Sequence, residues 1–453
     1  MSKKNNSVVA GKGYTGRASD YRMHEAKLYP NSLNDNDNYV DISNMIALTT
    51  IIEDIDTPFL EVTLNIVDAT SLIETFTLNG GERIVIQLNR KAPSLTNTGE
   101  YDPNSDGVLE KWNLELYITE IRDLVRESNV KQYFTLVCTT IETYRNASRI
   151  LDRAFKGSVA DIIKTIITND LSSTKSRIET DSVGTVSGIF PRIRPMQAIH
   201  WLSSSSFDNS TPFFFFATAK DGLTYRSYNS ILNDEVHNSY EYSPYFKEQG
   251  DSGKSYFEQQ KKIINISSPL NIGKAANIAR GTYSSNVHVL DVSNKSYEQR
   301  QYSYSPEDMR KLNEFAPFNQ PKDMPFDLND QSGASSHFIA KNTGAYADAD
   351  NISGPTGMPL LKAAAYKNNL EYMTQVININ GDFNLSVGAL VDLTVIRVGD
   401  AEYAKADEEV ESNIMVDTLS SCKYMATRIV STFDTEGFFQ TVTVQSDSSA
   451  IKL

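Results

Sequence analysis

The sequence has 453 residues, of which 40% are hydrophobic and 22% charged, and its formal net charge is −14. This composition is typical of a folded protein of several domains and is too polar for one that crosses a membrane with helices. No apolar run follows the basic residues at the N-terminus, so we expect no secretory signal and folding in the cytosol. The negative charge is spread along the chain and repels phosphate, which argues against tight binding of DNA.

Strands are indicated after an irregular start. Residues 1–38 are rich in Gly, Ser, Asn and Asp without periodic apolar positions, so we expect an N-terminal arm. From Tyr39 onward apolar residues alternate with polar ones, which indicates strands that bury one face. Asn79-Gly80-Gly81 supplies a tight turn between two of them. The alternating residues include Leu60, Val62, Leu64, Ile66, Ile84, Ile86 and Leu88. We predict an antiparallel β domain over residues 39–145.

The next segment shows helical spacing. Ser158 can cap a helix with Asp161 three positions later, and five apolar residues share one stripe of that helix. These residues are Val159, Ile162, Ile163, Ile166 and Ile167. A second short helix is expected at 195–202, and a hairpin at 213–228 turns at Asp221-Gly222. We predict an α+β domain over residues 146–257.

The last third of the sequence combines strands with a weakly patterned insertion. Residues 299–373 are rich in Ser, Asn, Tyr and Pro, and helices are indicated there only at Ser305 and near Pro359. We predict an insertion domain over 299–373 inside a second β domain formed by residues 258–298 and 374–448. The alternating runs after the insertion are 375–379, 389–396, 424–430 and 438–444.

Parts of the two β domains resemble each other in the same order, which is the pattern of an internal repeat. The matches are 64–72 with 287–293, 81–86 with 388–393, 117–122 with 424–430, and 133–137 with 438–444. Alternating strands look alike, so the shared order carries more weight than any single match, and it favours duplication of one β domain. Two unrelated sandwiches with similar strands are the alternative. With duplication, three chains would present six copies of one surface.

Two short motifs suggest ligands but lack the context that those ligands need. Residues 11–16 fit G-x-G-x-x-G, yet a dinucleotide site needs a buried strand before this motif and a helix after it, so a flexible arm is favoured. Residues 102–107 begin like a calcium loop, but Asn113 stands where the bidentate Glu is needed. A polar turn is the better interpretation.

The sequence shows no catalytic or metal-binding pattern. The histidines are scattered without H-x-x-x-H spacing, and there is no G-x-S-x-G elbow. Cys138 and Cys422 lie in alternating apolar runs, where a thiol packs as a small hydrophobic group, so we expect neither a disulfide nor a zinc site. The histidines are His24, His200, His237, His288 and His337. We expect no catalytic residue, no cofactor and no metal.

Residues 381–388, with the sequence GDFNLSVG, resemble a turn found in the baseplate central hub proteins of contractile-tailed bacteriophages. Residues 59–68, the 213–222 hairpin, the strand at 423–430 and the helix at Ser158 are also similar, so the resemblance covers most of 40–300 and 374–448. Glycine suits such turns because it has no Cβ. The glycines that we assign to structural turns are Gly80, Gly81, Gly222, Gly381 and Gly388.

This resemblance implies a fold class that is mainly β with α+β parts, in which the duplicated domains are antiparallel, tail-tube-like barrels. It implies a homotrimer that docks a tail tube protein on one side and a trimeric spike protein on the other. DNA would pass through its lumen without specific binding. The implied protein is not an enzyme and does not insert into a membrane; it lies in the tail baseplate of the virion after assembly in the host cytoplasm.

This chain departs from the family pattern in its long arm before Tyr39, its acidic segment 402–411 and its expanded insertion. Neighbouring baseplate proteins are the expected partners of those segments. A hub of a phage-like contractile injection system is one alternative. A carbohydrate-binding or hydrolytic tail component is another, because the tyrosine-rich stretch 225–245 could stack on sugars, although tyrosines also favour subunit interfaces.

Overall fold

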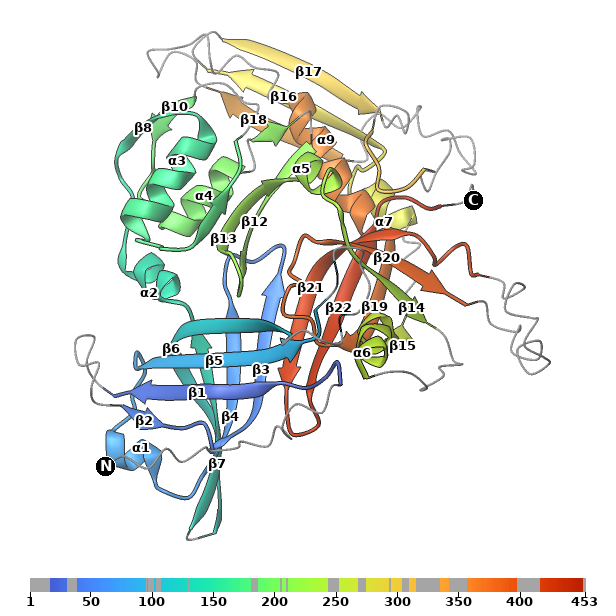
Figure 1. Cartoon of the computed structure of the whole chain (residues 1–453). Helices are drawn as coiled ribbons and strands as arrows, with labels where there is room; N and C mark the ends of the chain where they lie inside the picture. The colour runs from blue at the N-terminus through green and yellow to red at the C-terminus, as the bar shows by residue number, and fades with distance from the viewer. Residues whose placement is uncertain are drawn as a thin grey trace, which may run out of the picture.

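In the computed structural model the chain forms two neighbouring β-rich parts, with a helical part and a small sheet on one side of them (Figure 1). The residues that the structure describes are 17–30, 39–94, 96, 102, 107–128, 130–180, 186–203, 206–208, 211–242, 252–267, 274–292, 295–303, 309–314, 335–341, 357–396 and 416–450.

The first β part is a curled antiparallel sheet, and burial alternates along its strands as the sequence predicts, because successive side chains of a strand point to opposite faces. In sheet order its strands are β2 (Val40–Asp41), β1 (Arg22–Tyr29), β5 (Arg83–Ala92), β6 (Val108–Ser128), β7 (Lys131–Thr139), β4 (Glu61–Asp68) and β3 (Ile46–Asp54). The short helix α1 (Leu72–Phe76) follows β4.

The expectation of an irregular arm before Tyr39 is wrong for residues 22–29. They form β1, which pairs with β5 and buries Met23, Ala26 and Leu28. A β-bulge between Met23 and Glu25 shifts the alternation by one residue, and this shift hides the period of two in the sequence. The remaining residues of the predicted arm include 1–16 and 31–38, which lie outside the described residues.

The second β part continues the same sheet. In sheet order its strands are β14 (Val236–Tyr242), β20 (Leu390–Val395), β21 (Lys423–Phe433), β22 (Phe438–Ser446), β19 (Met373–Asn380) and β15 (Ile263–Ser267). Strand β3 of the first part pairs with β21, which makes one sheet of 13 strands among the described residues. The predicted strands at 375–379, 389–396, 424–430 and 438–444 are confirmed as β19 to β22.

The two β parts have the same order of strands. The sequence β3-β4-β7-β6-β5-β1 in the first corresponds to β15-β19-β22-β21-β20-β14 in the second. Neighbours in each series are antiparallel, except that β14 runs parallel to β20 where β1 runs antiparallel to β5. In this correspondence the predicted matches at 81–86, 117–122 and 133–137 fall on equivalent strands.

One predicted match is wrong. The sequence pattern pairs residues 287–293 with β4, but β16 (Ser284–Asp291) lies in a separate three-stranded sheet with β17 (Ser296–Ser303) and β18 (Ser335–Lys341). The strand in the place of β4 is β19. The boundary predicted between the second β domain and the insertion is wrong for the same reason, because β16 pairs with β17, which crosses that boundary, and with β18 inside the predicted insertion. A short alternating run carries no information on which strand it pairs with.

The α+β part follows β7 and agrees with the prediction in its helices and hairpin. Ser158 Oγ accepts a hydrogen bond from the Asp161 N–H at 3.1 Å, and the predicted apolar stripe of this helix is buried. Its elements are α2 (Ile141–Ser148), β8 (Ala154–Gly157), α3 (Val159–Thr165), the π-helix η1 (Ile166–Asp170), β9 (Ser176–Ile178), β10 (Val186–Ile189), α4 (Pro195–Ser203), β11 (Phe207–Asp208), β12 (Thr211–Thr218), β13 (Gly222–Ser227) and α5 (Tyr228–Leu232).

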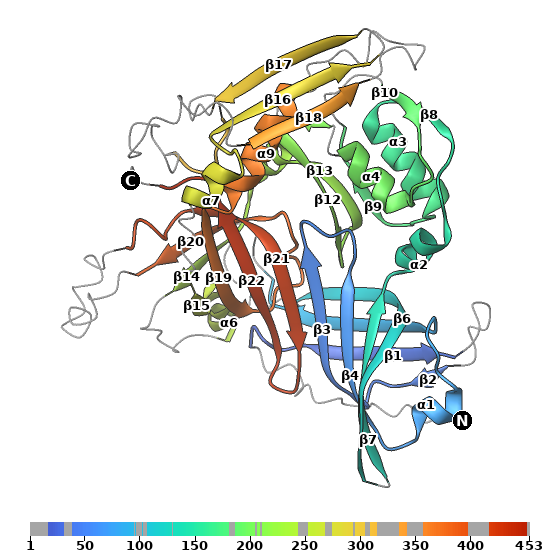
Figure 2. The same ribbon diagram turned by 180° about the vertical axis from the view of Figure 1, so that it is seen from behind.

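After α5, the described residues include three further helices: α6 (Ser252–Lys261), α7 (Lys274–Ala279) and α9 (Gly357–Leu370). Helix α9 confirms the helix predicted near Pro359 and contacts β16, β17 and β12, so it connects the three-stranded sheet to the rest of the molecule. Figure 2 shows α9 from behind, between that sheet and the second β part. The helix predicted to begin at Ser305 falls partly outside the described residues, and 309–314 are not helical.

Candidate assembly site

The two β parts meet along β3 and β21. Residues 49–54 pair with 428–433 in antiparallel register, and the Ile55 N–H extends the ladder by donating to the Thr427 carbonyl at 2.9 Å. In both ribbon views these strands lie side by side at the centre of the molecule (Figures 1 and 2). Backbone hydrogen bonds therefore fix the position of one part against the other.

An aromatic cluster packs beside this junction, formed by Trp112 of the first part and three phenylalanines of the second. The rings of Phe433 and Phe438 stack with centroids 4.1 Å apart, and Trp112 lies edge-on to Phe383 at 5.1 Å. The Trp112 indole N–H donates to the Phe383 carbonyl at 2.9 Å. All four side chains are buried, so the cluster combines apolar burial with a satisfied polar group.

Arg90 is a fully buried cation in the same region, and it is absent from the predicted site residues. Its guanidinium donates to the carbonyls of Ala18 and Gly381 at 2.7 and 2.6 Å and forms an ion pair with Glu110 at 2.6 Å. It therefore joins β5, the start of the described chain and the Gly381 turn. The alternation Ile84, Ile86, Leu88 continues to Arg90 and is the signal in the sequence that indicates its burial.

Glu53 is a buried carboxylate where three parts of the chain meet. Its side chain accepts hydrogen bonds from the N–H groups of Ala219, at the end of the hairpin strand β12, and of Val387, in the turn before β20, at 2.6 and 3.4 Å. Burial raises the pKa of Glu53 to about 7, against the lowering effect of those two donors. The alternation Ile51, Glu53, Ile55 again places a charged residue on the buried face of a strand.

Of the five predicted turn glycines, Gly81 and Gly388 occupy equivalent places and require glycine for the same reason. Their φ angles are +94° and +86°, which L side chains rarely adopt. The Gly81 N–H donates to the Ile118 carbonyl at 2.7 Å, and the Gly388 N–H donates to the Ala426 carbonyl at 2.8 Å. In each part this hydrogen bond joins the turn before one strand to the residue that precedes a β-bulge in the neighbouring strand, at Ile118 in β6 and at Ala426 in β21.

The other three predicted glycines have different surroundings. Gly80 precedes Gly81 with φ of +99°, and Gly222 has φ of +72° in the hairpin turn. Gly381 has no positive φ, but a Cβ there would lie 2.1 Å from the ring of Phe438. Gly381 is therefore needed for close packing at the aromatic cluster and not for an unusual backbone conformation.

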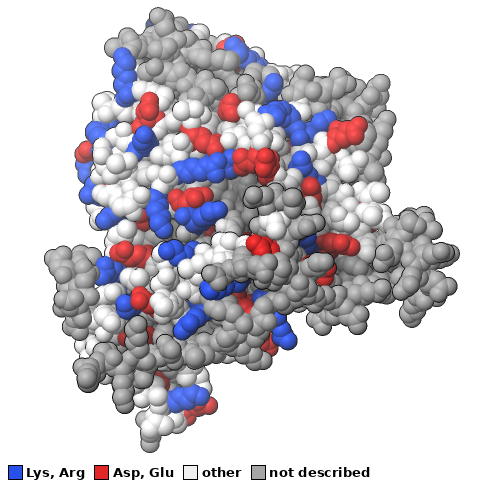
Figure 3. All heavy atoms as spheres, viewed as in Figure 1, with Lys and Arg blue, Asp and Glu red and all other residues white. Residues whose placement is uncertain are grey.

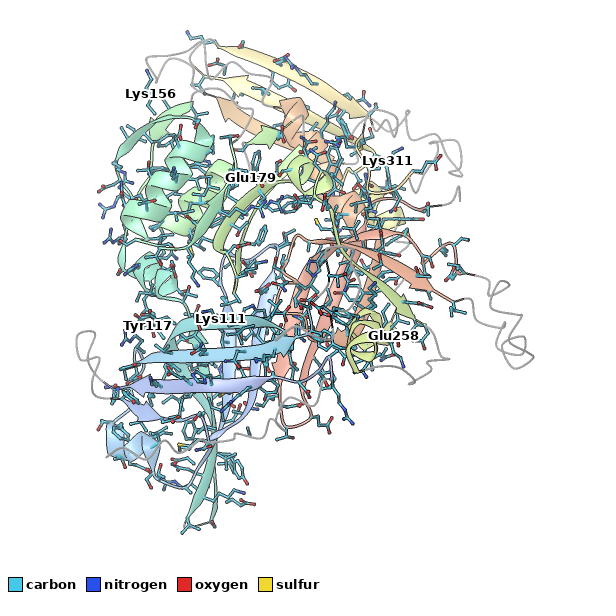
Figure 4. The ribbon with its side chains drawn as sticks, viewed as in Figure 1. Lys111, Tyr117, Lys156, Glu179, Glu258 and Lys311 are labelled. Carbon is cyan, nitrogen blue, oxygen red and sulfur yellow. The ribbon has the colours of Figure 1, made fainter. Side chains whose placement is uncertain are left out.

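A cavity of about 550 Å³ lies where the hairpin turn, β14 and the Gly388 turn meet. It is lined by charges of both signs, and Arg226 is held by Glu179 at 2.7 Å and Asp234 at 2.8 Å. Glu179 is labelled in Figure 4. These groups neutralise one another, so the cavity offers no concentrated charge to a ligand.

Three tyrosines of the tyrosine-rich stretch belong to the core and not to a sugar-binding surface. Tyr225, Tyr228 and Tyr240 are buried within the chain, and Tyr225 stacks on Phe213 with ring centroids 4.5 Å apart. These side chains cannot stack on a glycan or on another subunit. Their rings fill the space between neighbouring elements of one chain instead.

The remaining motifs add no site. Residues 11–16 and most of the 102–107 loop lie outside the described residues, as does the acidic segment 402–411. Among the residues that the structure describes, no three His, Cys, Asp or Glu side chains gather as metal ligands, and no helix is long and apolar enough to cross a membrane. Cys138 and Cys422 are buried. Acidic and basic side chains are interspersed over the face in Figure 3.

No protein-family model and no curated protein matches the sequence. Among solved structures, the chain is similar to a tail protein from Neisseria meningitidis MC58, with a TM-score of 0.51 and 11% identity over 94% of this chain and 96% of that one. It is also similar to the 43 kDa tail protein of prophage MuSo2 from Shewanella oneidensis, with a TM-score of 0.50 and 8% identity over 93% and 97%.

These likenesses show the class of fold. The chain shares the fold of these two tail proteins, one of them from a prophage; this fold is mainly β with a large antiparallel sheet, and the predicted resemblance is confirmed at this level.

The Gly381→Ala substitution should destabilise the protein by about 2–3 kcal/mol, because the new Cβ overlaps Phe438, whose ring is buried and stacked on Phe433. Gly81→Ala is the matched control: no atom lies within 4 Å of its Cβ, so only the positive φ costs energy, about 1 kcal/mol. Denaturant unfolding measures both. Equal losses would contradict the packing argument.

The Arg90→Met substitution should cost about 3 kcal/mol or more in unfolding free energy, because it leaves Glu110 Oε2 and the carbonyls of Ala18 and Gly381 without the donor that Arg90 supplies. Arg280→Met removes an exposed ion pair with Glu371 and should cost less than about 1 kcal/mol. Urea titration of the three proteins measures the difference. A small loss in the Arg90 variant would show that the buried cation is dispensable.

The raised pKa of Glu53 should make the free energy of unfolding decrease as the pH rises. Because its folded pKa lies above the unfolded value of 4.5, the carboxyl favours folding below pH 4.5 and loses this advantage as pH rises to about 7. The loss is on the order of 3 kcal/mol. The difference in unfolding free energy between the wild type and Glu53→Gln, measured from pH 4 to 8, isolates this effect. Parallel profiles for the two proteins would contradict it.

Proposed function

We propose that this chain is a non-enzymatic structural protein of a phage tail, and specifically the central baseplate hub that adapts a six-fold tail tube to a trimeric spike. The fold shared with two tail proteins, one of them from a prophage, supports the tail role. The observation that carries the hub role is the internal repeat of strand order within one chain.

The two β parts share two bulges as well as the order of strands, although β6 has further bulges between Arg122 and Val125 and between Arg126 and Ser128 that β21 lacks. A bulge interrupts β3 between Ile46 and Leu48, and β15 has one between Ile263 and Asn265. Such bulges are specific features of a fold and not random defects. Their agreement favours duplication of one domain over two unrelated sandwiches.

A second bulge is repeated with its side-chain contact. It falls at Thr119 in β6 and at Thr427 in β21. Thr119 Oγ1 donates to the Val137 carbonyl at 2.9 Å, and Thr427 Oγ1 donates to the Thr443 carbonyl at 3.3 Å. The repeat therefore extends to individual hydrogen bonds.

Both β parts also curl back on themselves. In the first, β2 comes just before β3 and pairs with β1; in the second, Lys262 comes just before β15 and bridges to Glu241 of β14. This supports two barrel-like domains, which we delimit as residues 17–140 and as 236–267 with 373–450. The α+β part and the three-stranded sheet are the other domains in this proposal.

In a homotrimer these two domains would give a ring of six similar units, which matches a hexameric tube above and a trimeric spike below. The net charge of −14 would keep DNA from adhering to the lumen as it passes. The protein would assemble in the host cytoplasm and remain in the virion, with neighbouring baseplate proteins around the ring. The hub of a phage-like contractile injection system has the same requirements and is the second candidate.

The purified chain, alone or mixed with the spike protein from its own source genome, should have the mass of a trimer by light scattering. Averaged electron micrographs should show a ring with about six units, because each protomer supplies two. A chain that stays monomeric with spike and tube proteins present would contradict the hub role. A dimer would exclude the three-fold adaptor.

A further inference from the structure

Strand β6 has an open edge. Residues 108–117 of β6 pair with β5 along that edge, and 117–128 pair with β7 along the other. Tyr117, labelled in Figure 4, is the last residue that pairs with β5. Beyond the Ile118 contacts with the Gly81 turn, the β5 side of β6 meets no other strand in the described part of the chain.

The equivalent edge in the second β part is occupied. Strand β21 pairs with β20 over 423–425, and past its bulge the same edge pairs with β3 over 428–433. Strand β3 itself pairs with β4 on its other side. One chain therefore already contains the contact that the open edge of β6 lacks.

Strand β15, the counterpart of β3, also has one side without a neighbouring strand among the described residues. It pairs with β19 as β3 pairs with β4, and no strand pairs with residues 263–267 on their other side within the described chain. In both ribbon views β15 and the β6–β7 hairpin lie on opposite sides of the β3–β21 junction (Figures 1 and 2). Among the described residues, β15 and the far part of β6 therefore each have a side that pairs with no strand, and the two lie on opposite sides of the junction.

We infer that β15 of one protomer pairs antiparallel with the open edge of β6 in the next protomer, as β3 pairs with β21 within the chain. This inference rests on the proposed trimeric hub and names the contact that closes its ring. The contact is heterologous, because two different surfaces meet, and a ring forms when three such contacts close. Its hydrogen bonds are those of strand addition to a sheet edge.

Exposed apolar side chains mark both surfaces. Leu124 and Val125 of β6 are 50% and 57% exposed, and Ile264 of β15 is 48% exposed. An edge strand that stays in water is normally protected from pairing by charges, proline or a cover. These side chains are explained if a second copy of the chain covers them.

The internal repeat also gives the register. Thr50 lies four residues after Ile46, which precedes the bulge in β3, and Ser267 lies four residues after Ile263, which precedes the bulge in β15. Thr432 pairs with Phe439, which lies four residues before Thr443, the residue whose carbonyl accepts from Thr427 at the bulge. Val125 likewise pairs with Tyr133, four residues before Val137, whose carbonyl accepts from Thr119 at the bulge. Since Thr50 pairs with Thr432 inside the chain, Ser267 should pair with Val125 between chains.

Cysteine pairs test this register. The double variant Ser267→Cys, Val125→Cys should form a disulfide-linked trimer on oxidation, and neither single variant should form one, because the two positions are on different surfaces. The pair Thr50→Cys, Thr432→Cys is the control, which should oxidise within one chain and give no linked species. Linked dimers from a single variant would indicate a two-fold contact and overturn the inference.

Charge substitutions test the surface independently. Val125→Lys and Ile264→Lys should shift the mass from trimer to monomer, whereas Val130→Lys, 74% exposed at the tip of the β6–β7 hairpin, should leave the trimer intact. Circular dichroism melts verify that each variant is folded. A trimer that survives both edge substitutions, without cross-linking of the cysteine pair, refutes the strand contact and leaves the hub intact. A wild type that is monomeric even with its spike refutes both.

Discussion

The pairing of β3 with β21 is the contact on which the rest of the structure depends. It converts two separate curled sheets into one and fixes their register through backbone hydrogen bonds. The buried groups around it are consistent with such a rigid junction, because Arg90, Glu53 and Trp112 each reach a backbone group of the other part of the chain. Buried charges are tolerated only when their partners are held at hydrogen-bonding distance, and this pairing holds them.

The two β parts share their order of strands and differ in what is attached to them. The α+β part follows β7 directly, whereas the three-stranded sheet and α9 come between β15 and β19. A repeated core with unequal attachments can combine approximate six-fold packing inside a ring with three-fold packing outside it. This combination is what an adaptor between a tube and a spike requires.

Much of this fold could be predicted from residue patterns, and the failures have physical causes. Alternation located β3 to β7 and β19 to β22, and a capping box located α3, because these signals are local. The bulge in β1 breaks the period of two, and the alternation of β16 does not indicate its sheet, because strand partners are set by tertiary contacts. Residue type alone does not predict the burial of Arg90 and Glu53, because charged residues are usually exposed. Both nevertheless follow the alternation of the buried apolar residues in their strands.

The position of β21 in the chain also determines when the first β part can be completed. Strand β3 is synthesised early, whereas its partner β21 lies near the end of the chain and is synthesised late. The backbone groups on one side of β3 therefore have no partner strand when β3 leaves the ribosome. Contacts between such distant segments form slowly, because a large loop must close first. A nascent chain that is halted before β21 would therefore expose the unpaired edge of β3, and such an edge can pair with strands of other chains.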